Sequence, residues 1–200
     1  MIKKFNRIDG ICVEKIYGQD RFGYSRSDFD DLYDLIKWAE QGGYQGSELK
    51  FYDFYTGDVY KPFDKKRNVA YGEPVYVESY LYFLQGDYGK NIVTLYRYLP
   101  EKVLETVVEF KIEEVNLYNL KIIGNPLFII SQDNEDGFRC YYPKKFSFPL
   151  QEQESVILIE DEKIYLEKWV EEGWDDENDC AISEEIGCLN QSENGDWWIS

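Results

Sequence analysis

Carboxylates are the most numerous side chains in this sequence that could take part in chemistry. Its 200 residues include 39 Asp and Glu against 22 Lys and Arg, and no His. The absence of His excludes Ser-His-Asp and Cys-His nucleophile systems, the imidazole proton shuttle and every metal site that uses His. Two facing carboxylates can hydrolyse a glycosidic bond, so a carboxylate-based glycoside hydrolase is one functional hypothesis. Among so many acidic residues no pair stands out, and the catalytic residues stay unassigned.

One short motif fits a nucleophilic mechanism by its letters but not by its context. Ser47 and Lys50 form an S-x-x-K string, in which acyl-transfer enzymes place the hydroxyl and the amine one helical turn apart. Here the string leads into an extended segment, where positions three apart face opposite sides. The S-D-N and K-T-G partner motifs are also missing, so the string does not indicate an enzyme.

Two acidic runs, 132–143 and 175–186, alternate oxygen-bearing side chains in the way a calcium-binding loop does. In the first run Pro143 stands where the terminal bidentate carboxylate belongs, and in the second Cys180 replaces the glycine of the sharp turn. The sequence also has no glycine-rich nucleotide-binding loop. We therefore expect solvated turns, no metal site and no cofactor.

The elements that must position these groups begin with a helix predicted over residues 28–41. Ser27 can cap its first turn, acidic residues of that turn suit the positive end of the helix dipole, and Gly42 and Gly43 end the helix. Its apolar stripe, at spacings of three and four residues, consists of Phe29, Leu32, Ile36 and Ala39. Such a helix is expected to pack on the rest of the domain.

After the helix the pattern alternates with a period of two residues, which predicts β-strands joined by tight turns. Three hairpins are predicted, with turns at Thr56-Gly57-Asp58, Pro100-Glu101-Lys102 and Pro143-Lys144-Lys145. The first residues of these turns are 44 and 43 residues apart. Each interval holds enough sequence for about four short strands, which is the content of one propeller blade.

The near-constant step predicts an all-β, mainly antiparallel fold with at least twelve strands. We expect a small propeller-like array of about four hairpin-based blades over residues 48–200, with one N-terminal helix, in a single domain spanning residues 1–200. A β-meander or a two-sheet sandwich is the alternative, in which the spacing is accidental. Even spacing along the strands also predicts one packed face made of Tyr76, Tyr80, Tyr82, Tyr96 and Tyr98.

The composition predicts a folded, cytoplasmic protein. Hydrophobic residues make up 44% of the sequence, no apolar run is long enough to cross a bilayer, and the first residues do not form a signal peptide. The four cysteines have no C-x-x-C spacing and are expected to be reduced thiols. The net charge of −17 disfavours nucleic acid and anionic membrane as partners, favours a monomer and attracts a basic protein.

A surface for such a protein partner is predicted in the C-terminal part of the sequence. Its candidate binding residues are Trp174, Asp175, Asp176 and Trp197. Adjacent Trp197 and Trp198 would point to opposite faces of a strand, so that one of the two is exposed. The preferred hypothesis is therefore a binding module without catalytic activity, such as an inhibitor or immunity protein that covers a basic toxin or nuclease.

Overall fold

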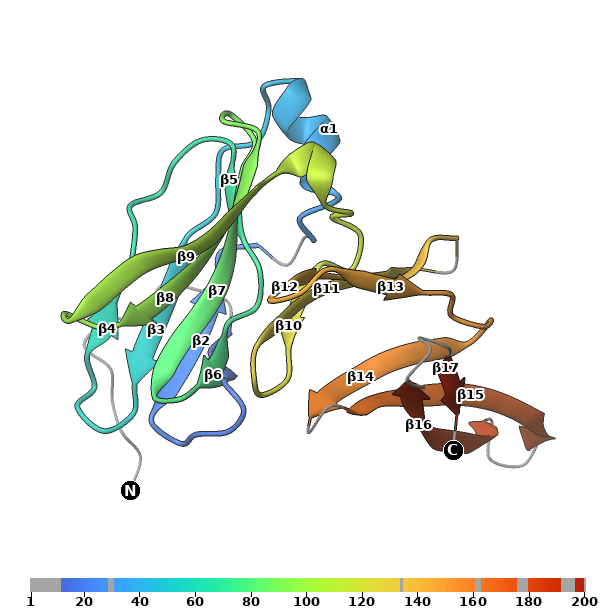
Figure 1. The fold of residues 1–200 in the computed structure, drawn as a ribbon. Coiled ribbons are helices and arrows are strands. Elements are labelled where there is room, and N and C mark those ends of the chain that lie inside the picture. Colours follow the sequence, from blue (N-terminus) through green and yellow to red (C-terminus); the bar gives the residue numbers. More distant parts are fainter. Residues whose placement is uncertain are drawn as a thin grey trace. The chain divides into compact units, whose positions relative to one another are not determined.

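The computed structural model (Figure 1) describes residues 12–28, 31–133, 135–160, 163–175, 180–191 and 197–199. From residue 169 onward it describes the backbone alone. Within these ranges the chain forms seventeen β-strands, one short α-helix and one 3-10 helix. The strands pair mainly antiparallel, which confirms the predicted all-β class and the prediction of at least twelve strands. No helix in the described ranges is long and apolar enough to cross a membrane.

The chain divides into two compact units, Met1–Ile122 and Ile123–Ser200, and the expected single domain stays a prediction. The first unit contains two sheets. Sheet A has sequential strands, which are β1 (Glu14–Lys15), β2 (Phe22–Arg26), β3 (Leu49–Asp53) and β4 (Val59–Tyr60). Sheet B has the order β5-β7-β8-β9, with β6 paired to β7, and its strands are β5 (Val69–Tyr71), β6 (Val75–Val77), β7 (Tyr80–Asp87), β8 (Ile92–Leu99) and β9 (Val103–Lys111).

The second unit also contains two sheets of sequential strands. Sheet C, whose first strand begins at the end of the first unit, consists of β10 (Lys121–Ile123), β11 (Phe128–Asp133), β12 (Gly137–Tyr142) and β13 (Phe146–Phe148). Sheet D consists of β14 (Glu154–Glu160), β15 (Lys163–Asp175), β16 (Cys180–Gln191) and β17 (Trp197–Ile199).

The three predicted hairpins are all present, and each joins the last two strands of its sheet. They are β3–β4 in sheet A, β8–β9 in sheet B and β12–β13 in sheet C. Glu101, at the centre of the second turn, has a positive φ of 61°, as the tight connection between Leu99 and Val103 requires. The steps of 44 and 43 residues therefore reflect sheets that use similar lengths of chain. Closure of these sheets into a propeller stays a prediction, and they equally fit the meander or sandwich alternative.

The core of the first unit joins residues of sheets A and B. Leu49 and Phe51 on β3 contribute from sheet A, and Leu81 and Phe83 on β7 contribute from sheet B. Phe83 is 0% exposed. Its ring centroid lies 5.6–6.4 Å from those of five other aromatic rings, namely Phe51, Phe63, Tyr71, Tyr96 and Tyr98. Aromatic packing therefore supplies much of the contact in this core.

The prediction that five tyrosines share one packed face is wrong, because they divide between the two faces of sheet B. The three that pack on the core are Tyr76, Tyr96 and Tyr98. The core face of β7 instead carries Leu81 and Phe83, which pair with Tyr98 and Tyr96. Tyr80 and Tyr82 alternate with these core residues, so they point to the opposite face.

The helix is shorter than the predicted range 28–41. Helix α1 occupies only Leu35–Glu40, and the 3-10 helix η1 (Ile112–Glu114) follows β9. Ser27 does not cap a helix, because its N–H donates to the Glu48 carbonyl and its Oγ accepts from the Glu48 N–H, which continues the pairing of β2 with β3. Tertiary pairing thus replaces the local helix signal at this end. Phe29, the first residue of the predicted stripe, lies outside the described residues.

Sheets C and D of the second unit share a core that includes Phe138 and Val156. Gln132 of β11 connects the two sheets through the backbone of Val156 on β14. Its Oε1 accepts a hydrogen bond from the Val156 N–H at 2.8 Å, and its Nε2 donates to the Val156 carbonyl at 3.4 Å. Since β14 is an edge strand of sheet D, this side-chain amide occupies the position of a neighbouring strand.

Replacing Gln132 with Ala is expected to destabilise the second unit by about 2 kcal/mol, because the buried Val156 N–H loses its partner where water cannot replace it. Urea unfolding followed by tryptophan fluorescence measures the change. The matched control is Gln151→Ala, at an exposed site, with an expected loss of about 0.5 kcal/mol or less. Equal losses for the two variants would show that the amide does not stabilise the contact between the sheets.

Candidate protein-interaction surface

The outward face of sheet B carries an accessible group of aromatic and charged side chains near the β8–β9 turn. Tyr82, Arg97 and Glu105 lie directly opposite one another across β7, β8 and β9. Tyr80 precedes Tyr82 by two positions on the same face. These four side chains are half-buried or exposed, whereas Leu81 and Phe83 between the tyrosines are buried in the core.

Arg97 is held in place by its neighbours on this face. Its guanidinium carbon lies 4.6 Å from the ring centroid of Tyr80, and its Nη2 forms an ion pair with Glu105. A cation stacked on an aromatic ring keeps a defined orientation. Tyr and Arg are enriched among residues that dominate protein–protein binding energy, and side chains ordered before binding lose less entropy on association.

Aliphatic side chains surround this group. Half-exposed Val75 pairs with Tyr82, and half-exposed Leu99 pairs with Val103 at the start of β9. We call this surface the Tyr80–Arg97 face, and it consists of Val75, Tyr80, Tyr82, Arg97, Leu99, Val103 and Glu105. A central aromatic and arginine group with apolar neighbours has the composition of a protein-binding surface.

The other half of the same sheet face is covered. Leu84, Val93 and Leu95 there are at most 1% exposed. A Cβ added at Gly86 would lie 3.3 Å from a methyl carbon of Leu32, in the segment that leads into α1. The Tyr80–Arg97 face is therefore the half of sheet B that this segment leaves accessible.

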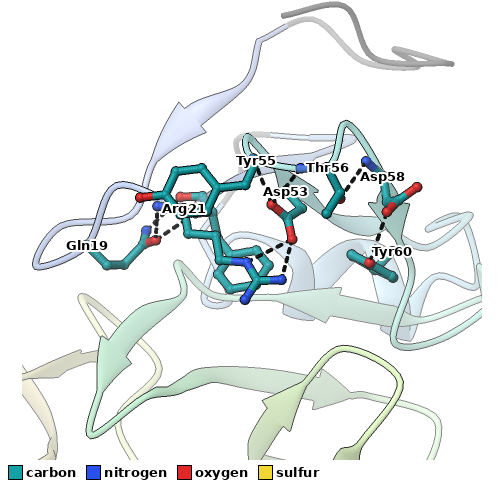
Figure 2. A network of polar contacts seen from close by, with 8 residues as sticks. Gln19, Arg21, Asp53, Tyr55, Thr56, Asp58 and Tyr60 are labelled. Atoms are coloured by element: carbon teal, nitrogen blue, oxygen red, sulfur yellow. Dashed lines mark hydrogen bonds and ion pairs between the residues drawn. The ribbon is translucent and has the colours of Figure 1, made fainter.

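A second polar network fixes the turn of the first hairpin (Figure 2). Nε and Nη2 of Arg21 donate to one oxygen of Asp53, at 2.8 and 2.7 Å. The other oxygen accepts from the backbone N–H groups of Tyr55 and Thr56, at 2.8 and 3.2 Å. Burial alone would raise the pKa of the Asp53 carboxyl, but these hydrogen bonds outweigh it and hold the pKa below its usual range. The network stabilises the turn at Thr56.

Three buried carboxylates each serve a turn. Asp53 organises the turn of the first hairpin, and Asp87 forms an ion pair with Lys66 at 2.7 Å while it accepts from the turn after β7. Glu154 accepts from the backbone N–H of Gln151 at 2.9 Å. The described residues contain no group of three or more acidic or cysteine side chains placed to share a metal ion. These three carboxylates therefore have structural roles.

The motifs weighed in the sequence also have structural roles where they are described. The Ser47 hydroxyl lies 3.3 Å from that of Ser27, and the Lys50 amine lies 3.4 Å from a Glu48 oxygen. In the acidic run 132–143, Asp133 accepts from the backbone N–H groups of the β11–β12 turn. These contacts differ from those of the acyl-transfer site and the calcium-binding loop with which the two motifs were compared.

Two of the four cysteines have described side chains, and both are free thiols. Cys12 is exposed and Cys140 is buried. Burial raises the pKa of the Cys140 thiol to about 11, so this thiol stays protonated at neutral pH. The side chains of Cys180 and Cys188 lie outside the described part of the chain.

The binding residues predicted from the sequence lie in sheet D. Trp174 and Asp175 end β15, where their backbones pair with Ala181 and Cys180, and Trp197 begins β17. The side chains of these three residues and all of Asp176 lie outside the described residues. Their role in binding stays a prediction.

The Tyr80–Arg97 face was not among the predicted sites. Its only sequence signal is the Tyr-Leu-Tyr-Phe alternation of β7, which does not say which of its two apolar faces is covered. Comparisons with protein-family profiles, with curated proteins and with solved structures find no match.

Proposed function

We propose that this chain is a protein-binding module without catalytic activity, and that a protein partner docks on the Tyr80–Arg97 face. The observation that carries the proposal is an accessible sheet face whose centre is built from Tyr80, Tyr82 and a pre-ordered Arg97. Such residues contribute most of the energy at many interfaces when an apolar partner surface excludes water around them.

The charge of the chain favours a basic partner. Residues 123–200 contain 19 acidic and 5 basic residues, whereas residues 1–122 contain 20 and 17, so the second unit carries 14 of the 17 excess negative charges. A strongly acidic unit attracts a cationic protein over a distance and accelerates the encounter. The proposal is thus a cytoplasmic, monomeric inhibitor or immunity-type protein whose four sheets are successive blade-like repeats.

The proposal predicts that binding depends on the face. The immobilised chain should retain a basic protein in equimolar amount from its native lysate, and the variant Tyr82→Ala should bind this protein about 30-fold more weakly, because a central anchor contributes about 2 kcal/mol. Tyr17→Ala, at a side chain 91% exposed in the loop before β2, is the matched control and should bind as the unaltered chain does.

Calorimetry with the purified partner supplies the dissociation constants. Equal affinities for Tyr82→Ala and the unaltered chain would exclude the Tyr80–Arg97 face as the binding surface. A retained partner with a net negative charge would contradict the electrostatic part of the proposal. Added salt should slow association with a basic partner, since the long-range attraction is screened.

A further inference from the structure

Strand β9 presents a long free edge beside the Tyr80–Arg97 face. It spans nine residues, Val103–Lys111, and among the described residues it pairs with β8 alone, at the end of sheet B. Figure 1 shows it as the outermost strand of its sheet. Backbone N–H and C=O groups on the outer side of an edge strand can pair with another extended chain.

The side chains of β9 are unusually accessible for a strand of a packed sheet. Only Phe110 is buried, Leu104 is 43% exposed, and Val103, Val107 and Val108 are half-exposed. Valine, leucine and threonine suit a pleated strand that gains a neighbour. Proteins usually block such an edge with proline or with lysine along the strand, yet β9 has no proline and its one lysine is the last residue.

A bulge at Val107 divides the edge into two regular parts. Val103 to Thr106 pair in order with Leu99 to Tyr96 of β8. Val107 is then skipped, and pairing resumes between Val108 and Leu95. An added strand without a bulge therefore fits one part at a time. The part before the bulge shares Val103 and Glu105 with the Tyr80–Arg97 face, so a partner on that face would also reach this edge.

The charges at this edge select the added strand. Five glutamates and two lysines occupy residues 101–114, and exposed Glu105 and Glu109 lie within the strand itself. An acidic segment would place like charges opposite these residues, which destabilises a strand pair. A second copy is also disfavoured, because it would bring the same excess of glutamates to the edge, where like charges destabilise strand pairing.

We infer that β9 accepts an extended segment of a basic partner, with lysine or arginine at alternate positions, as an additional antiparallel strand of sheet B. This inference rests on the proposed function, since it takes the partner to be basic, and it adds the mode of docking. Backbone hydrogen bonds to β9 supply affinity, and contacts between cationic side chains and the glutamates supply selectivity.

The test uses a fluorescent peptide of the length of β9 that alternates lysine with threonine or valine. A second peptide has the same side chains, but its N–H groups are methylated at alternate residues on the edge that would pair. Both peptides have the same charge, so only the first can add a strand. We expect the methylated peptide to bind the full chain at least about tenfold more weakly in fluorescence anisotropy.

Charge reversal at the edge is the second arm of the test. Glu105→Lys reverses a charge on the part of the edge before the bulge, and Glu109→Lys reverses one on the part after it. The variant on the part that the peptide occupies should weaken binding of the unmodified peptide about tenfold, since it replaces a cross-strand attraction with a repulsion, and no effect of either variant would overturn the inference. Glu40→Lys, at an exposed position of α1 with the same change in net charge, is the matched control and should change binding less than about twofold. Hydrogen exchange should slow at backbone amides of residues 103–111 when the unmodified peptide binds.

Each alternative outcome has a separate meaning. Equal binding of the two peptides would show attraction by charge alone and would overturn the added strand, while the proposed function would still be tested by Tyr82→Ala. No binding of either peptide would also overturn the inference. The peptide could add a strand while Tyr82→Ala leaves binding of the protein partner unchanged. That result would keep the edge of β9 as a binding site and exclude the Tyr80–Arg97 face as one.

Discussion

Replacing Phe83 with Ala is expected to destabilise the first unit by about 4 kcal/mol. The side chain is fully buried, and its ring lies among those of five other aromatic residues, which come from both sheets and from the segment between β4 and β5. Its removal leaves a cavity that rigid aromatic neighbours fill poorly, so the lost burial and the lost ring contacts add. Urea unfolding followed by far-UV circular dichroism measures the loss.

Phe83→Leu is the control for this experiment, because it keeps most of the buried volume and should cost about 1.5 kcal/mol or less. Tyr82→Ala changes the neighbouring residue on the outward face, where no core cavity forms, and should cost clearly less than Phe83→Ala. A loss below about 1.5 kcal/mol for Phe83→Ala would mean that sheets A and B do not close over this ring.

Removal of the Asp53 carboxylate is expected to cost about 3 kcal/mol at pH 7. The side chain is 0% exposed, and the change leaves two backbone N–H groups of the turn and the guanidinium of Arg21 without their acceptor. Arg21 is 48% exposed and can turn to water, which keeps the cost below that of breaking a fully buried ion pair. The variant to make is Asp53→Ala.

The pH dependence of this loss has a definite sign. The pKa of Asp53 is lowered in the folded protein, so its contribution is fully present above the ordinary aspartate pKa of about 3.9 and is lost as the pH falls through the lower folded value. The stability difference between the unaltered chain and Asp53→Ala should thus shrink below about pH 4. Urea unfolding at pH 7, 4 and 3 measures it.

Asp58→Ala, an exposed acid of the same turn, is the matched control for Asp53→Ala. Its carboxylate accepts from the Tyr60 hydroxyl at 3.4 Å, and we expect a loss of about 0.5 kcal/mol at pH 7. A loss for Asp53→Ala that is the same at pH 7 and pH 3 would show that the carboxylate does not act through its charge.

The hairpins were predictable because the residues that make them are adjacent in the sequence. Gly57 has a φ of +85° in the first turn, which glycine adopts without strain. The length of the helix was not predictable in this way. Ser27 carried a local capping signal, but its hydrogen bonds go to Glu48, a residue distant in the sequence, and no local pattern contains that contact.

The distribution of the tyrosines shows a second limit of sequence patterns. A spacing of two residues shows that side chains share a face only within one strand. After a turn, the register of the next strand decides which of its residues point to that face. Leu81 pairs with Tyr98, so the even-numbered tyrosines of β7 and β8 point to opposite faces. The candidate surface could not be found from spacing for this reason, since it required the register between the strands.

The sequential order of the strands has a consequence for how the chain reaches this fold. Hydrogen-bonded neighbours within each sheet are also neighbours in the chain, apart from β5, which pairs with β7. Apart from β2 and β3, which residues 27–48 separate, each pairing therefore closes a short loop at a small entropic cost, and the sheets have low contact order for β-structure. We expect the chain to fold faster than a β-sandwich of equal length whose strands pair with distant partners. During synthesis, each sheet can form once its own strands have left the ribosome.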